Sequence, residues 1–97
     1  LMNDSSSLAS SYGYIGKILY AKQNTSDAIS YYNKAIEIAG SRNDIYNLAW
    51  LYKSLSNIYE HKKDYKTAYK YHLKHAEFQQ SLMESDYIKK IGHYPNL

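Results

Sequence analysis

The sequence predicts an all-α fold, an antiparallel array of two helical hairpins followed by a C-terminal capping helix. Two observations support this prediction. The chain matches itself in one register when it is shifted by 40 residues, so that Asp4 falls on Asp44. Apolar side chains recur at spacings of three and four residues, as one face of an α-helix requires, and no long stretch alternates with the period of a strand. The predicted units are residues 1–42, residues 43–82, and a short helix with its tail over 83–97.

The first unit is expected to contain two helices joined by a polar turn at residues 23–25, where Gln, Asn and Thr stand together. Its second helix is expected to end near Gly40, because glycine is the preferred residue directly after a helix. The helical spacing is carried by Leu8, Tyr12, Ile15, Gly16 and Leu19 in the first helix, and by Ala28, Ile29, Tyr32, Ala35 and Ile36 in the second.

The second unit repeats this plan. Asp44 is predicted to cap a helix that runs to about Lys62, and Asp64 to cap the next one, because a carboxylate accepts hydrogen bonds from the free backbone N–H groups of a first turn. The helical spacing is carried by Leu48, Leu51, Tyr52, Leu55, Ile58 and Tyr59, and then by Tyr65, Ala68, Tyr69, His72, His75, Ala76 and Gln79.

Small residues occupy matching places in the two units. Gly16 and Ser56 stand 40 residues apart on the first helix of each hairpin, and Ala28 and Ala68 stand 40 residues apart on the second. We expect these residues to face one another, because small side chains let two helices approach closely.

The residues after 82 continue with a short apolar face formed by Tyr87, Ile88 and Ile91. Gly92 and Pro95 are expected to end it. Two interpretations stay open for this segment: a short helix that caps the last hairpin, or the beginning of a third repeat.

Composition excludes several classes of protein. The chain of 97 residues has no cysteine, which removes disulfides, thiolate metal sites and cysteine nucleophiles. Its net charge of +3 comes almost entirely from lysine, so direct nucleic-acid binding by this segment is not expected. No membrane span or signal peptide is predicted. Because the chain begins at Leu1 rather than Met, we expect it to belong to a longer protein. The compartment, cytoplasmic or periplasmic, then depends on that parent.

The order of large, small and aromatic positions resembles the tetratricopeptide repeat (TPR). In the first unit the pattern is Tyr12, Ile15, Gly16, Leu19, Ala28, Tyr32 and Ala35, and in the second it is Tyr52, Leu55, Ser56, Tyr59, Ala68, His72 and His75. The sequence departs from the family in its period of 40 instead of 34, in lacking the proline that commonly ends a repeat, and in placing His75 where alanine is usual. Residues 51–59, 63–71 and 78–82 further resemble repeats in the sensor regions of Bacteroidetes-type signalling proteins and transcriptional regulators.

The resemblance implies that partners bind on the concave face, which is lined by the first helix of each hairpin. Trp50 is the most informative residue there, because tryptophan is enriched at binding hot spots. Packing of Trp50 against the neighbouring hairpin is the alternative. The predicted partner-binding residues are Tyr14, Lys17, Tyr20, Trp50, Lys53, Ser54, Asn57, Glu60 and His61.

Other patterns are assigned to structure rather than chemistry. Lys53 and Asn57 stand where one TPR subgroup holds a peptide carboxylate, but two polar residues one helical turn apart are ordinary. The lysines at 62, 66, 70 and 74 are expected to form a solvated face. His72 and His75 lack an obvious third ligand, so no metal site and no cofactor are predicted. No catalytic constellation is found, and an enzyme is not expected.

The sequence therefore predicts a protein- or peptide-binding module, a scaffold or sensor part of a larger bacterial signalling or transcription-regulatory protein. The alternative is a structural segment that oligomerises through its repeat ends and has no separate ligand. At least about three repeats are usually needed for stability, so exposed stack ends are expected to self-associate.

Overall fold

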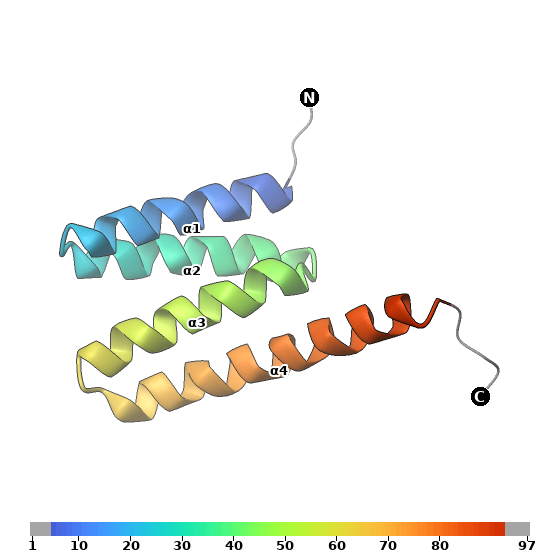
Figure 1. The fold of residues 1–97 in the computed structure, drawn as a ribbon. Helices are drawn as coiled ribbons and strands as arrows, with labels where there is room; N and C mark the ends of the chain where they lie inside the picture. The colour runs from blue at the N-terminus through green and yellow to red at the C-terminus, as the bar shows by residue number, and fades with distance from the viewer. Residues whose placement is uncertain (1–4, 93–97) are drawn as a thin grey trace.

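Four α-helices follow one another in the computed structural model, which describes residues 5–92 (Figure 1). They are α1 (Ser5–Ala21), α2 (Thr25–Ser41), α3 (Ile45–His61) and α4 (Tyr65–Lys90). The described part of the chain contains no strand, so the prediction of an all-α hairpin array is confirmed. Helices α1 and α2 form one antiparallel hairpin, and α3 and α4 form the second (Figure 1).

The helix boundaries repeat with the 40-residue register. Helices α1 and α3 have 17 residues each and begin at Ser5 and Ile45, while α2 and α4 begin at Thr25 and Tyr65. The long period is therefore explained by long helices, because only three residues separate one helix from the next.

The three loops share one backbone geometry. Each has a residue with positive φ at its centre: 69° at Gln23, 52° at Asn43 and 65° at Lys63. The next residue in each loop donates its N–H to a carbonyl five residues back, as Asn24 does to Leu19 at 2.8 Å. This is the pattern of a Schellman motif, which closes a helix with a residue in the left-handed region.

The position of Gly40 corrects one expectation. Gly40 lies inside α2, which continues to Ser41, and the residue with the left-handed conformation after the helix is Asn43 and not a glycine. Asparagine tolerates this region better than most residues because its short amide bonds locally. The two predicted aspartate caps are confirmed: the Asp44 carboxylate accepts from the backbone N–H of Asn47 at 3.3 Å, and Asp64 accepts from Thr67 at 3.2 Å.

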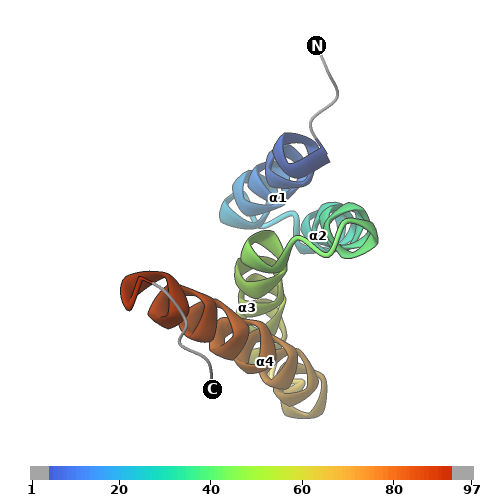
Figure 2. The same cartoon turned by 90° about the vertical axis from the view of Figure 1, so that its right-hand side faces the viewer.

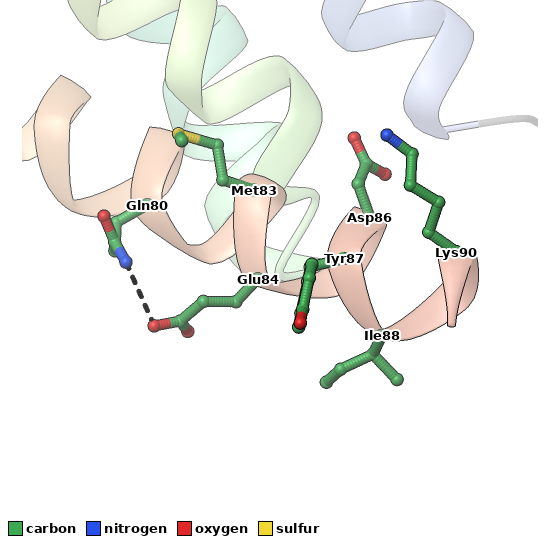
Figure 3. Close-up of a pocket in the computed structure, with 7 residues that line it drawn as sticks. All are labelled: Gln80, Met83, Glu84, Asp86, Tyr87, Ile88 and Lys90. Carbon is green, nitrogen blue, oxygen red and sulfur yellow. Dashed lines mark hydrogen bonds between the residues drawn. The ribbon is translucent and has the colours of Figure 1, made fainter. Parts of the chain in front are cut away.

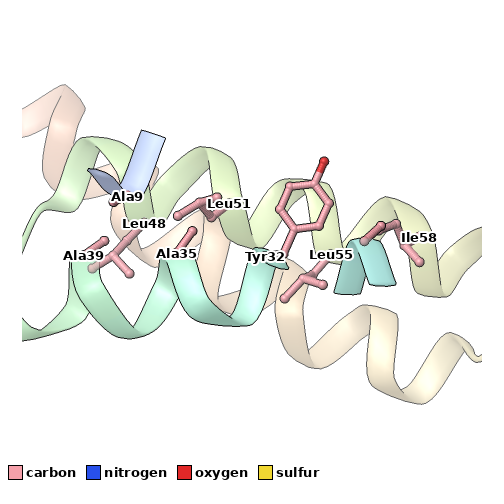
Figure 4. Packing of buried hydrophobic residues seen from close by; sticks show 9 residues of the cluster. Ala9, Tyr32, Ala35, Ala39, Leu48, Leu51, Leu55 and Ile58 are labelled. Atoms are coloured by element: carbon pink, nitrogen blue, oxygen red, sulfur yellow. The ribbon is translucent and has the colours of Figure 1, made fainter. Parts of the chain in front are cut away.

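The core lies where α3 packs into the groove between α1 and α2 (Figure 4). The apolar face of α3 is almost fully buried there, with Leu51 and Leu55 each at 0% exposure. Small side chains on α1 and α2 make room for it. The buried cluster consists of Ala9, Ala28, Tyr32, Ala35, Ala39, Leu48, Leu51, Leu55 and Ile58.

The predicted small-residue contacts within each hairpin are confirmed. A Cβ at Gly16 would lie 3.1 Å from the carbonyl oxygen of Ala28, so α1 and α2 are almost in backbone contact. The Ser56 hydroxyl donates to the carbonyl oxygen of Ala68 at 3.1 Å across the second hairpin. In both hairpins the two helices therefore approach at the same repeat position.

Helix α4 differs from α2 in length and in contacts. It runs without a break over 26 residues to Lys90, so the separate short helix expected after residue 82 does not form. Those residues extend α4 past the end of α3 (Figure 1). Among the described helices α4 packs on α3 alone, away from α1 and α2 (Figure 2). Pro95, which was expected to end the tail, lies outside the described residues.

Candidate functional site

A hollow of about 390 Å³ opens across α3 on the side that faces α1 and the second half of α4. We call it the tryptophan hollow. It gathers four of the predicted site residues on one surface: Tyr14, Lys17, Trp50 and Lys53. The complete lining is Tyr14, Lys17, Tyr46, Ala49, Trp50, Lys53, His75, Gln79 and Leu82.

Trp50 forms the floor of this hollow and also joins the two hairpins. Its ring stacks on Tyr14 with centroids 5.4 Å apart, and it covers Gly13, where a Cβ would come within 2.5 Å of Trp50 Cη2. The indole Nε1 donates to Asn47 Oδ1 at 2.8 Å. The packing alternative for Trp50 therefore holds, although the half-buried ring still presents surface to the hollow.

The two lysines of the hollow carry its charge. Lys17 projects from α1 and Lys53 from α3, and both side chains are exposed. The lining of the tryptophan hollow contains no carboxylate, and neither ammonium is paired with a carboxylate within residues 5–92. An anionic group placed here would meet two exposed cations that have no carboxylate partner, beside an aromatic floor.

His75 connects α4 to α3. Its Nδ1 donates to the carbonyl oxygen of Ala49 at 2.8 Å, because a carbonyl can only accept. The equivalent position in the first hairpin is Ala35, which is fully buried, whereas His75 is half-buried. At this repeat position the second hairpin therefore has an imidazole that lines the tryptophan hollow, where the first has a buried methyl group.

A second hollow of about 380 Å³, the tyrosine hollow, lies along the other half of α3. Asn57 and Glu60, two further predicted residues, line it together with Lys53, which borders both hollows. The two hollows together follow the groove between α3 and α4, and we call them the α3/α4 groove. The lining of the tyrosine hollow is Lys53, Ser56, Asn57, Glu60, Tyr65, Ala68, Tyr69 and His72.

The remaining predicted residues are outside both hollows. The Ser54 hydroxyl donates to the carbonyl oxygen of Trp50 at 3.0 Å, so it is engaged by its own helix. Tyr20 and His61 lie against each other, with ring centroids 6.4 Å apart. His61 Nδ1 donates to the carbonyl oxygen of Asn57 at 2.9 Å.

Sequence reasoning missed the contribution of α4 and of two residues of α3. The tryptophan hollow is completed by Tyr46 and Ala49 from α3 and by His75, Gln79 and Leu82 from α4. The resemblance assigned the binding face to the first helices alone, so residues of α4 were not considered. The histidine in an alanine position was the available signal that α4 contributes a polar side chain to this surface.

Two tyrosines packed in or against the core have displaced pKa values. Burial raises the pKa of Tyr32, while a hydrogen bond with Ser54 lowers it and the nearby Tyr20 raises it. Burial also raises the pKa of Tyr71, and Tyr59 and Tyr52 add to that effect. A raised phenol pKa keeps the hydroxyl neutral in these packed positions.

His72 and His75 are neighbours on α4, with ring centroids 6.1 Å apart. Over the described range, no group of three or more histidine, cysteine or acidic side chains is arranged to hold a metal ion. None of the four helices is long and apolar enough to cross a membrane.

A scan against models of protein families, a search of curated proteins and a search of solved structures each returned no match for this chain. The function is therefore argued from the groove itself.

Proposed function

We propose that the chain is a TPR-like module that binds a protein or peptide segment in the α3/α4 groove, as part of a larger bacterial signalling or transcription-regulatory protein. One observation carries the proposal: the tryptophan hollow combines an aromatic floor, formed by Tyr14 and Trp50, with two unpaired lysines, Lys17 and Lys53. Aromatic surface beside directional polar groups is typical of protein recognition sites. The proposed role is binding and not catalysis.

The internal packing of the chain supports a helical or extended segment as the bound element. The groove between α1 and α2 holds a helix, α3, whose residues from Leu48 to Ile58 contribute its buried side chains. The α3/α4 groove occupies the equivalent place in the second hairpin, and no described element fills it. Helix-in-groove binding is a common mode of peptide recognition.

The experiment is a selection of binding peptides from a displayed random library, followed by titration of the selected peptides into variants of the chain. We expect Lys17→Glu and Lys53→Glu each to weaken binding about tenfold or more, since each variant replaces an attracting charge with a repelling one. Lys66→Glu is the matched control, because Lys66 is exposed on α4 and lines neither hollow.

Binding that is insensitive to both groove variants, or a library that yields no peptide, contradicts the proposal. Lys53→Glu is a cleaner probe than Trp50→Ala, because removal of the indole also removes the contact with Gly13 and the hydrogen bond to Asn47.

A second candidate, oligomerisation through a repeat end, is favoured by the outer face of α1. Leu8, Ile15 and Ile18 are 48%, 39% and 57% exposed. Their equivalents on α3 are buried at 4%, 0% and 1%, and these are Leu48, Leu55 and Ile58. The same face is therefore buried in the core in one hairpin and exposed in the other. An exposed apolar face of this kind is suited to contact with another chain. If α1 mediates self-association, Ile18→Ser abolishes it in sedimentation experiments, whereas self-association that survives this change excludes the α1 face.

A further inference from the structure

The chain contains one packed hairpin–hairpin interface and both surfaces of a second one. Helix α3 fills the groove between α1 and α2. In the 40-residue register α1 is the counterpart of α3, and the α3/α4 groove is the counterpart of the groove that α3 fills. No described element covers the outer face of α1 or the α3/α4 groove. The packed interface is therefore a template for a contact between these two open surfaces.

The outer face of α1 has the pattern of a buried face. Four positions at spacings of three and four residues share this side of the helix, and these are Leu8, Ser11, Ile15 and Ile18. Their counterparts are the residues that α3 buries in its groove, Leu48, Leu51, Leu55 and Ile58. The single charged residue of α1, Lys17, is on the opposite side. Cover of this face therefore removes apolar atoms from water and desolvates no charge.

The sizes of facing side chains are reversed between the filled groove and the open one. In the filled groove the small residue belongs to the groove, because a Cβ on Gly13 would lie 2.5 Å from Trp50 Cη2 and 2.8 Å from Leu51 Cδ2. In the open groove Lys53 stands in place of Gly13. On α1 two serines, at 10–11, stand in place of the tryptophan and the leucine. A large groove residue thus faces small helix residues, and exchanges that conserve volume are the ones that packed contacts tolerate best.

We infer that α1 of one copy of the chain fills the α3/α4 groove of another copy, in the register that α3 has in the groove between α1 and α2. The copies then add head to tail, because the two surfaces that meet are different parts of the chain. Contacts of this kind need no two-fold axis and build assemblies larger than a dimer. The inference rests on the proposed function, since it names the occupant of the same groove. A selected peptide then competes with α1 of the other copy.

The polar groups of the open groove find partners on α1. In the inferred register Lys53 of one copy meets the hydroxyl groups of Ser10 and Ser11 of the next, and a hydroxyl oxygen accepts from an ammonium. The Ser10 hydroxyl donates to Asn47 Oδ1 at 3.2 Å within its own chain, which leaves its lone pairs free to accept. The docked helix therefore accommodates Lys53 without a carboxylate.

A hydrogen bond across the filled groove also has a counterpart. Tyr32 on α2 is hydrogen-bonded to Ser54 on α3. The residues 40 positions away are His72 in the groove and Tyr14 on α1, and both are exposed. An imidazole and a phenol can form the same kind of bond, so the transposed contact keeps a polar pair at this place.

Sedimentation of two variants and of their mixture tests the inference on the whole chain. The wild-type chain is expected to form assemblies whose mass rises with concentration. Ile18→Ser weakens the α1 face, and His72→Glu places a carboxylate where Tyr32 is covered in the filled groove, so each variant alone is expected to associate at least about tenfold more weakly. An equimolar mixture is expected to form a dimer and nothing larger. In that dimer the intact α1 of the His72→Glu chain fills the intact groove of the Ile18→Ser chain.

Disulfide formation tests the register, because the chain has no cysteine of its own. A chain with Ser11→Cys is mixed with a chain with Lys53→Cys and oxidised under mild conditions. The two thiols are expected to cross-link at least about tenfold faster than Ser11→Cys does with Tyr87→Cys, because only the first pair is held together in the inferred contact. Tyr87 is a matched control, since it is 65% exposed and projects from the last turns of α4 beside Glu84 and Ile88 (Figure 3).

Every outcome decides for or against the inference once circular dichroism shows that the variants remain helical. A wild-type chain that stays monomeric at millimolar concentration overturns it, as does a mixture that forms no dimer. Association that His72→Glu leaves intact and Ile18→Ser abolishes means that two α1 faces pair with each other, which also overturns it. If the chain is monomeric but a selected peptide binds through Lys53, the proposed function survives and only α1 as the occupant is wrong.

Discussion

Gly13 gives the most demanding test of how the two hairpins stack. A Cβ at this position would lie 2.5 Å from Trp50 Cη2 and 2.8 Å from Leu51 Cδ2, whereas carbon atoms pack at about 3.5–4.0 Å. Gly13→Ala therefore forces α1 away from α3 by about 1 Å or displaces the indole. Overpacking of this kind costs about 1–3 kcal/mol of unfolding free energy.

Gly40 provides a matched control for the same chemical change. Gly40 is exposed inside α2, and a Cβ there meets nothing within 4 Å. Gly40→Ala is expected to stabilise the chain by about 1 kcal/mol, because alanine has the higher helix propensity. This gain applies equally at Gly13, so the difference between the two variants isolates the contact with Trp50.

The assay is urea unfolding followed by circular dichroism on the two variants and on Gly16→Ala. Gly16 is intermediate, since a Cβ there would lie 3.1 Å from the carbonyl oxygen of Ala28. The unfolding free energy is expected to rise in the order Gly13→Ala, Gly16→Ala, Gly40→Ala, with about 1–3 kcal/mol between the extremes. If Gly13→Ala proves as stable as Gly40→Ala, the close approach of α1 and α3 is refuted.

Three further predictions concern the loops, the caps and the buried tyrosines. Lys63→Gly should raise the unfolding free energy by about 0.5–1 kcal/mol in urea unfolding, because Lys63 has a φ of 65° that glycine adopts without strain. Asp44→Ala should lower it by about 1 kcal/mol, whereas Asn24→Ala should cost less, since Asn24 makes no side-chain capping bond. Thermal unfolding of both variants compares them, and equal losses would contradict the assigned caps. Burial raises the pKa of Tyr32 above that of the unfolded chain, so its contribution to stability is complete below about pH 10 and is lost as the pH rises through the folded-state pKa. Stability titrated from neutral to alkaline pH should fall less steeply for Tyr32→Phe than for the wild-type chain.

The hairpin plan could be predicted from the sequence because it depends on local signals repeated twice. The spacing of Leu48, Leu51 and Leu55 defines one helical face, and Asp44 and Asp64 supply the caps. The internal repeat supports the same prediction, because one 40-residue register relates both units. The helix boundaries in the structure follow this register.

The end of α4 and the shape of the groove could not be predicted in the same way. The spacing of apolar residues does not show that α4 continues past residue 82. Its last turns contact no other described helix, so no buried face marks them in the sequence. The groove depends in part on His75, whose imidazole lines the tryptophan hollow and bonds to a carbonyl oxygen in α3. The sequence shows a histidine where alanine is usual, but it does not show which backbone group on the neighbouring helix that side chain contacts.

One hairpin groove is filled by α3, and its equivalent between α3 and α4 is open. Thiol labelling tests this directly, because the chain has no cysteine of its own. Ala39→Cys and Gln79→Cys introduce thiols at equivalent places, the first 1% exposed beneath α3 and the second exposed. In dilute protein, Gln79→Cys is expected to react as fast as a thiol in a short peptide and Ala39→Cys about a hundredfold more slowly, because its exposure requires opening of the core. Equal rates at the two positions would contradict the difference between the filled and the open groove.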